Sequence, residues 1–446
     1  MCRFFLVWQC LLFGAGALAQ EGRADAPGTR LTIAEILRRI DALDPSLREK
    51  AFERLRTEVE LRRARWNRVQ GSLRVRASET LGNQVILPSE EVQAGVSDWS
   101  DRLTVGILGE VALPLFTGGQ ITGQIENAEN KLQSVQEQTR ARALELKRAA
   151  LVAYGRLILS GRQAEVAREA LDRSVQLVAI AERRMRTGIG TEADVARTKL
   201  SVLSQKEDLE RRRGEKELAT AALKALLFIE SDAAIQPAED LDALSSLRGK
   251  ESARERPELL ALAWQLRASE AEVQVSRAAA WPRLELFLSG SYGNDNGLSS
   301  PFLADPREYS SHLGVFAGSV LGGVRLEWKV FDFFVVRDDI AAKEAAQNSI
   351  AARLESERWR LRREAMEANA RLEEALRRKA ALAEGREIAN RVIQLARTRY
   401  ETGNAILTEV ITAEIEANQI QIRQNQADYD VAIAHIEQRI ALGQEL

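Results

Sequence analysis

The chain has 446 residues, of which 29% are charged and only 5% are aromatic. It is too long for one ordinary compact core, and this composition is more typical of long exposed helices than of a globular enzyme. Its 63 basic residues are balanced by 65 acidic ones, so no excess of positive charge points to nucleic acid.

Residues 1–19 have the pattern of a secretory signal peptide. Arg3 supplies the positive charge, an apolar stretch follows, and Ala17-Leu18-Ala19 is a small-x-small cleavage site. The apolar stretch is too short for a membrane-spanning helix. Both cysteines, Cys2 and Cys10, lie in this segment, and the bulky residues before Cys10 disfavour its lipidation. The mature chain is therefore expected to lack disulfides and thiolate metal sites.

The first half of the chain, residues 20–236, is predicted to begin with helix and to continue with two strands. The helical region covers residues 31–70 and breaks at Asp44-Pro45-Ser46. Apolar and polar residues then alternate with period two, which predicts strands over 71–82 and 102–116.

The second half, residues 237–446, is predicted to repeat this order. A helix over 257–280 precedes strands over 282–293 and 320–331. In the last strand the alternation is clean, because Val324, Leu326, Trp328 and Val330 alternate with charged residues.

A long helical hairpin is expected to end each half, over residues 120–229 and 333–443. None of the nine prolines falls within either range, as expected because proline disrupts a helix interior. A helix of about seventy residues would be about 105 Å long. The last helix carries two adjacent apolar seams, which favour a tube of helices over a compact bundle.

The two halves match at a constant offset of 215 positions. This offset relates Phe116 to Phe331, Thr187 to Thr402, Gly188 to Gly403, and Asp194 to Glu409. One offset thus covers a strand end, a long helix and a hairpin tip, so the chain contains an internal two-fold repeat.

Charged residues gather on one face of the predicted strands. They are Arg74, Arg76, Glu285, Arg325, Glu327 and Lys329. An apolar outer face with a polar inner face is typical of an outer-membrane barrel, whose lumen this charged set would line. Four strands cannot close a barrel, and open sheet edges cannot lie in lipid. Either the sheet packs on something in water, or several chains contribute strands to one barrel.

Two further sets of residues occupy matching places in the two halves. The joins between strands and helices carry Pro114, Phe116, Gly118, Gly119, Phe331 and Asp332. The hairpin tips carry Thr187, Gly188, Asp194, Val195, Thr402, Gly403, Glu409 and Val410. With these residues and the repeat, the chain resembles the TolC family of outer-membrane efflux proteins over about residues 31–443.

The resemblance implies an α+β fold in which long helical hairpins form a periplasmic helical barrel. Four strands per chain would contribute to a trimeric, twelve-stranded β-barrel in the outer membrane of a Gram-negative bacterium. The homotrimer would be the exit duct of a tripartite efflux or type I secretion system. It would work as a passive conduit without a cofactor, energised by an inner-membrane pump through a periplasmic adaptor. Cargo and pump class stay open.

The resemblance also assigns the tip residues to the periplasmic entrance. Glu409 matches an acid of the constricting ring of relatives, whereas the second acid of that ring falls on Thr412 and a locking arginine on Ala405. In the alternative interpretation, Asp194 and Glu409 only favour the starts of the returning helices, where the helix dipole attracts acids.

No enzyme is predicted. The two histidines, His312 and His435, have no metal-like partner spacing, and the glycines of residues 318–323 lack the lysine and the helix of a phosphate-binding loop. The alternative to a duct is a secreted, extended coiled-coil structural or adhesion protein whose strands pack in water.

Overall fold

The computed structural model describes residues 29–82, 100–230, 234–246, 255–293 and 317–444. The predicted signal peptide and His312 lie outside these residues. Two compact units make up the chain. Unit 1 comprises Met1–Pro45, Ala143–Ala253 and Ala365–Leu446, and unit 2 comprises Ser46–Arg142 and Arg254–Glu364. Each unit therefore combines segments from both halves of the sequence.

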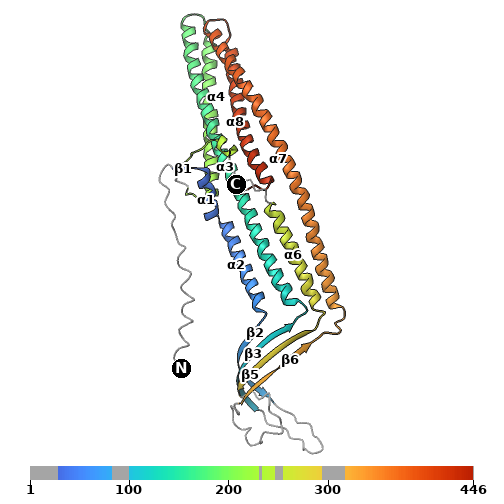
Figure 1. Ribbon diagram of the computed structural model, residues 1–446. Helices are drawn as coiled ribbons and strands as arrows, with labels where there is room; N and C mark the ends of the chain where they lie inside the picture. Colours follow the sequence, from blue (N-terminus) through green and yellow to red (C-terminus); the bar gives the residue numbers. More distant parts are fainter. Residues whose placement is uncertain (1–28, 83–99, 231–233, 247–254, 294–316, 445–446) are drawn as a thin grey trace, which may run out of the picture. The chain divides into compact units, whose positions relative to one another are not determined.

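Both halves follow the same order of elements (Figure 1). The first contains β1 (Thr29–Leu31), α1 (Ile33–Leu43), α2 (Pro45–Trp66), β2 (Gln70–Gly82), β3 (Ser100–Phe116), α3 (Gln120–Arg186) and α4 (Glu192–Leu227). The second contains β4 (Ile235–Pro237), α5 (Leu241–Ser245), α6 (Pro257–Ala278), β5 (Arg283–Gly293), β6 (Ala317–Glu327), α7 (Val335–Glu401) and α8 (Leu407–Ala441).

Some element boundaries differ from those expected. The helical region expected to reach residue 70 ends earlier, since α2 ends at Trp66 and β2 begins at Gln70. The expected break at Asp44-Pro45-Ser46 is present, because Asp44 caps the end of α1 and Pro45 opens α2. The last strand ends at Glu327 instead of residue 331. Its partner β5 begins at Arg283, and the preceding Pro282 has no N–H with which to extend the ladder. Elements β1, β4 and α5 are additional.

In unit 1, a buried apolar seam joins the two helical hairpins near their tips. Leu177 of α3 packs in one cluster with residues of α7 and α8, namely Ala396, Tyr400, Leu407, Val410 and Ala413. Within each of these two helices the members recur every three or four residues, so they lie on one face of α7 and on one face of α8. Burial of these apolar side chains contributes to the attraction between the hairpins.

The N-terminal strand of unit 1 is fixed to the segment that connects the two halves. Thr29–Leu31 pairs in parallel with Ile235–Pro237. The fully buried Tyr154 donates its hydroxyl to the Leu31 carbonyl at 3.1 Å and accepts the Glu239 N–H at 3.2 Å. Burial raises the pKa of Tyr154 above its usual value, so the hydroxyl stays protonated and keeps both bonds.

In unit 2, buried polar groups as well as apolar side chains hold the helices together. Leu61 and Ala64 of α2 pack on Ile125 and Ala128 of α3. Asn127 of α3 donates to the Ala268 carbonyl of α6 at 2.8 Å, which satisfies a buried amide. No helix in the described part of the chain has the apolar length needed to cross a bilayer.

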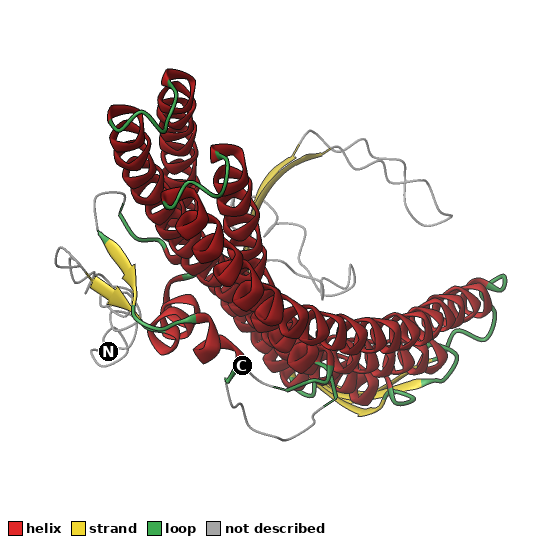
Figure 2. Cartoon of the chain, turned by 90° about the horizontal axis from the view of Figure 1, so that it is seen from above, coloured by secondary structure: helices red, strands yellow, loops and turns green. Residues whose placement is uncertain are grey.

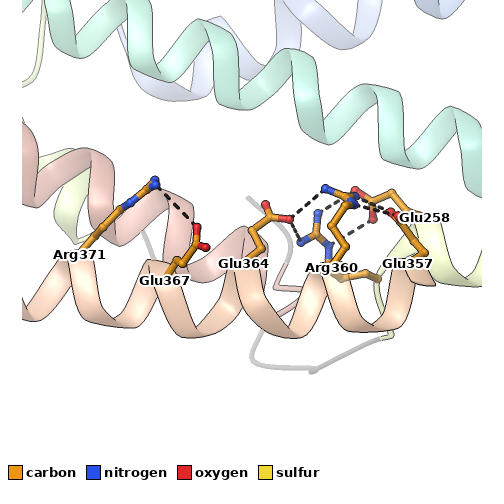
Figure 3. Close-up of polar contacts among 7 residues, drawn as sticks. Glu258, Glu357, Arg360, Glu364, Glu367 and Arg371 are labelled. Atoms are coloured by element: carbon orange, nitrogen blue, oxygen red, sulfur yellow. Dashed lines mark hydrogen bonds and ion pairs between the residues drawn. The ribbon is translucent and has the colours of Figure 1, made fainter. Parts of the chain in front are cut away.

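An ion cluster fixes the start of α6 to α7 within unit 2. Arg256, only 10% exposed, contacts Glu258 at 2.9 Å and Glu364 at 3.1 Å. Burial would lower the pKa of Arg256, but the two carboxylates outweigh it and raise this pKa. Figure 3 shows Glu364 on α7 beside Arg360, which contacts it at 3.5 Å and also pairs with Glu357.

The sheet of unit 2 has four antiparallel strands in the order β2-β3-β5-β6. Figure 2 shows the strands in yellow and the helices in red, with helices making up most of the described chain. Strands β2 and β6 are the edges of the sheet, so each leaves one row of backbone groups without a partner strand among the described residues.

Candidate functional site

The two helical tips end their first helix in the same way. At the first tip, the Gly188 N–H bonds the Met185 carbonyl at 3.1 Å and the Ile189 N–H bonds the Arg184 carbonyl at 3.0 Å. This is a Schellman motif, which needs a left-handed residue, and Gly188 supplies it with φ +76°. Thr187 also bonds back to the last turn through its hydroxyl.

The second tip repeats this motif. The Gly403 N–H bonds the Tyr400 carbonyl at 3.1 Å and the Asn404 N–H bonds the Arg399 carbonyl at 2.7 Å. Gly403 has φ +84°, and the Thr402 hydroxyl bonds the Thr398 carbonyl at 3.0 Å. The predicted equivalence of the tip threonines and glycines is therefore a shared backbone geometry.

The returning helices begin differently at the two tips. At the first tip, the Thr191 hydroxyl accepts the Asp194 N–H at 3.2 Å and the Asp194 carboxylate accepts the Thr191 N–H at 3.2 Å. This reciprocal capping box satisfies two amides at the start of α4. Val195, the next residue, is buried. Asp194 thus has a structural contact at the start of its helix.

At the second tip, Ile406 precedes α8 and its hydrocarbon side chain cannot cap the helix. Glu409 instead extends to Arg399, with 3.4 Å between its Oε1 and the arginine Nη1. Its side chain remains 44% exposed, whereas Val410 beside it is fully buried. Glu409 therefore presents a carboxylate at the tip surface in the first turn of α8.

A groove of about 540 Å³ lies between α7 and α8 beside this tip. Its lining combines an apolar surface with Arg399, Glu409 and Glu416. Thr412, where the resemblance places the second acid of the ring, also lines the groove. The groove therefore brings together Glu409 and Thr412, the two positions that the resemblance relates to the acids of the constricting ring.

Tyr400 connects the two tips through a contact that no pattern in the sequence predicts. Its ring is buried, and the Arg184 guanidinium lies 4.3 Å from the ring centroid. Burial raises the pKa of Tyr400, although the nearby Arg184 charge lowers it. The contact is a cation–π interaction between residues 216 positions apart, which no local pattern reveals.

The sheet confirms the predicted separation of charged and apolar side chains. Five members of the charged set lie on one face by register, namely Arg74, Arg76, Glu285, Arg325 and Glu327. Arg325 contacts Glu285 at 2.6 Å, and Arg74 contacts Glu110 at 3.4 Å. Lys329 lies beyond the end of β6, so it is not a strand residue. Glu110 was not predicted, because Leu108 and Ala112 interrupt the alternation around it.

The opposite face of the sheet is apolar and exposed. Side chains from all four strands contribute to it, including Leu73, Val75, Ile107, Val111, Leu286, Leu288, Val320, Val324 and Leu326. A face of this kind is unfavourable in water, so it requires an apolar environment or a partner.

The joins between sheet and helices combine tight backbone with exposed aromatic rings. The register shifts between Pro114 and Phe116. Gly118 must be glycine for space, because a Cβ there would lie 2.7 Å from the Trp281 Cβ. Gly119 follows with φ +92°. The backbone of this join therefore packs closely against Trp281, which lies between α6 and β5.

At the other join, Asp332 accepts the Val336 N–H at 2.9 Å and so caps α7. Phe333 and Phe334 both have positive φ, 54° and 69°, a strained conformation for bulky residues. The Phe331 ring packs edge-to-face on that of Phe333 with centroids 4.7 Å apart. All three rings are exposed.

The described residues hold no cluster of His, Cys, Asp or Glu that could bind a metal ion. His435 lies on α8, where burial and the charge of Arg439 lower its pKa. The candidate functional features are therefore the two tips and the groove in unit 1, and the two-faced sheet in unit 2.

Comparison with known proteins gives consistent matches. A family model described as outer membrane efflux protein matches residues 38–227 and 249–444. Outer membrane protein OprJ of Pseudomonas aeruginosa is 27% identical over 403 residues, which cover 87% of this chain and 80% of OprJ. Fusaric acid resistance protein FusA of Burkholderia cepacia is 23% identical, and the match covers 74% of this chain and 57% of FusA.

Solved structures match over nearly the whole chain. CusC superposes with a TM-score of 0.78 at 18% identity, covering 96% of each chain. The outer membrane protein VceC of Vibrio cholerae superposes with a TM-score of 0.74 at 19% identity, covering 92% of this chain and 96% of VceC.

Proposed function

Because this chain belongs to the outer membrane efflux protein family, we propose that it forms the exit duct of a tripartite efflux or type I secretion system. The family is located in the outer membrane with a periplasmic extension. The observation that carries the proposal is the sheet with one ion-paired face and one exposed apolar face. Such a sheet suits a barrel with lipid outside and water inside.

A closed barrel needs more than one copy of the chain. The edges β2 and β6 must pair, since unpaired backbone groups are not tolerated in lipid. An antiparallel contact between β6 of one copy and β2 of the next continues the observed order. Two copies would give a barrel of eight strands, and side chains nearly fill the interior of a barrel of that size. We therefore favour a homotrimer with twelve strands and an open lumen.

Aromatic residues support this placement in the membrane. Exposed rings mark all four places where strands meet helices, at Trp66, Phe116, Trp281, Trp328 and the cluster of Phe331, Phe333 and Phe334. Outer-membrane barrels carry aromatic girdles at both membrane interfaces. These rings would therefore mark the periplasmic interface, and the helices beyond them would extend into the periplasm.

The tips would form the periplasmic entrance and meet an adaptor protein linked to an inner-membrane pump. The duct itself would conduct by diffusion, and the pump would supply the energy. Three Glu409 carboxylates around one axis would favour cations at the constriction. The exposure of Glu409 and its single long contact with Arg399 support this role, whereas the capping contacts of Asp194 support a structural one.

Single-channel conductance in a planar bilayer tests the proposal. The detergent-purified mature protein should give steady, cation-preferring conductance, and Glu409→Ala should reduce that preference. The matched control is Asp194→Ala, which removes the equivalent acid of the first tip and should leave ion preference unchanged. Equal conductance and ion preference in all three proteins would support the duct and contradict the proposed ring of Glu409 carboxylates.

A second measurement separates the duct from its alternative. Outer-membrane fractions should contain a heat-resistant trimer with a β-barrel signal. A protein that stays soluble and never inserts into a bilayer would instead favour the secreted coiled-coil interpretation.

A further inference from the structure

A row of exposed polar residues runs along one face of α8 and begins at the second tip. Its members are Glu409, Thr412, Glu416, Gln419 and Arg423. They are three or four residues apart, so they lie on one side of the helix. The adjacent row, with Val410, Ala413 and Ala417, is apolar and buried. The polar row is therefore the side of α8 that suits contact with water.

The two acids of this row differ in their partners. Glu409 lies 3.4 Å from the Arg399 guanidinium, which offsets part of its charge. Glu416 lines the same groove, but no ion pair or hydrogen bond joins its side chain to another group in the described part of the chain. Glu416 should therefore attract free cations more strongly than Glu409 does.

The acid at position 416 belongs to the second half of the chain alone. At the offset of 215 positions, Glu416 corresponds to Ser201 on α4, whereas Glu409 corresponds to the acid Asp194. The repeat therefore does not account for Glu416, and this carboxylate is an addition to the second hairpin.

The spacing along α8 separates the two carboxylates without changing their direction. Glu416 lies seven residues beyond Glu409, which is almost two helical turns and about 10 Å. This distance is also about one Debye length at 0.1 M salt, so each carboxylate acts on ions at its own level. Arg423, seven residues farther, is the next charge of the row and ends its acidic part.

We propose that Glu416 determines the cation preference of the duct, more strongly than Glu409 does. This inference rests on the proposed function, because it needs three copies around one axis with the polar row of α8 facing the lumen. Three Glu416 carboxylates then form a second acidic ring, about 10 Å farther from the tip than the Glu409 ring. Cations concentrate at this ring because no basic side chain offsets it.

Planar-bilayer recording in a gradient of KCl tests the proposal. Near 0.1 M salt, Glu416→Gln should lower the ratio of K⁺ to Cl⁻ permeability by about twofold or more, and by more than Glu409→Gln does. The control Glu192→Gln removes an exposed acid from the first turn of α4 and should keep the ratio. An unchanged ratio in Glu416→Gln would overturn the inference and leave the duct intact. Absence of conductance in wild type would contradict the duct itself, and the inference with it.

Two variants at Thr412 separate the charge of Glu416 from a structural role. Thr412→Glu in the Glu416→Gln background returns a carboxylate to the same row, one turn nearer the tip, and should restore the ratio. Thr412→Lys keeps both acids but places a cation four residues from Glu416, so it should lower the ratio even if Glu416→Gln does not assemble. A ratio that neither variant changes would overturn the proposal.

Discussion

The two helical tips end their first helix in the same way and begin their second helix differently. Gly188 and Gly403, which are 215 residues apart, end α3 and α7 with the same left-handed turn and the same pair of backbone bonds. Past the turn, α4 begins with the Thr191–Asp194 capping box, whereas α8 begins after Ile406 with no side-chain cap.

This difference shows which parts of a repeat are free to diverge. A left-handed turn strongly favours glycine, and both copies keep it. A helix start can be stabilised in several ways, so the acid at this position has separate contacts in the two copies. Asp194 binds its own backbone, and Glu409 faces outward to Arg399.

The largest expected effect concerns two residues that occupy matching positions of the repeat and differ in burial. Tyr400 is 3% exposed in the apolar seam, while its counterpart Met185 is 41% exposed. We expect Tyr400→Ala to cost about 3 kcal/mol, as for other buried aromatics, and Met185→Ala about 0.5 kcal/mol or less. Hydrogen exchange of tip amides measures both. Tyr400→Phe keeps the ring beside Arg184 and should behave as wild type; equal losses for the two alanine variants would contradict the seam.

A second pair differs in the space available. A Cβ on Gly190 would lie 2.9 Å from the Met185 nitrogen and 3.1 Å from the Arg184 carbonyl carbon, and backbone cannot move aside as a side chain can. Gly190→Ala should therefore destabilise the first tip by about 1–3 kcal/mol. At the matching position, Ala405 packs on the seam, and Ala405→Gly should cost less than about 1 kcal/mol. Limited proteolysis at the tips compares the two, and resistance of Gly190→Ala would show that the turn rearranges.

Replacement of the tip acids Asp194 and Glu409 should have smaller effects on stability, and the dependence on salt concentration distinguishes the two variants. Asp194→Ala removes a capping box and should cost about 1 kcal/mol in low and high salt alike. Glu409→Ala removes an exposed ion pair worth about 0–1 kcal/mol, and about 1 M salt should abolish the difference from wild type. Thermal melts at two salt concentrations distinguish them. A salt-independent loss in both variants would assign Glu409 to helix capping as well.

The smallest effect concerns pH. His435 on α8 matches Thr220 on α4, so only the second hairpin titrates at this position. Burial, together with Arg439, lowers the folded pKa of His435 below its unfolded value. The unfolded chain then binds more protons than the folded chain. The stability that His435 contributes is therefore fully present above about pH 6.5 and declines on acidification. His435→Gln should flatten the stability profile slightly between pH 7 and 5, as followed by melting temperature, while Thr220→Val should not change its slope.

The sequence predicted the fold because its main features are periodic. The repeat, the long helical hairpins and the four strands follow from spacing alone, and the structural similarity to CusC and VceC confirms the TolC-like fold. The alternation around Arg74 and Arg325 also predicted the two faces of the sheet correctly. Roles of the tip residues remain predictions, although the structure supplies their geometry.

Other features have no local signal. Strands β1 and β4 have three residues each and pair across more than 200 positions, so no periodicity marks them. The stacking of Arg184 on Tyr400 depends on which segments become neighbours. The alternation continues through Lys329 and predicts it to be a strand residue, whereas β6 ends at Glu327, where its partner β5 begins.

The pairing of β1 with β4 has a consequence for the order in which the chain can fold. Thr29–Leu31 lies near the start of the chain, but its partner strand Ile235–Pro237 comes only after α4. The Glu239 carboxylate, which accepts the Ile33 N–H, also comes after α4 and is 206 positions from Ile33. A chain that emerges from its N-terminus must leave this segment unpaired until the connecting segment arrives. Such distant contacts slow folding, so the first half cannot complete its structure before the second begins to appear.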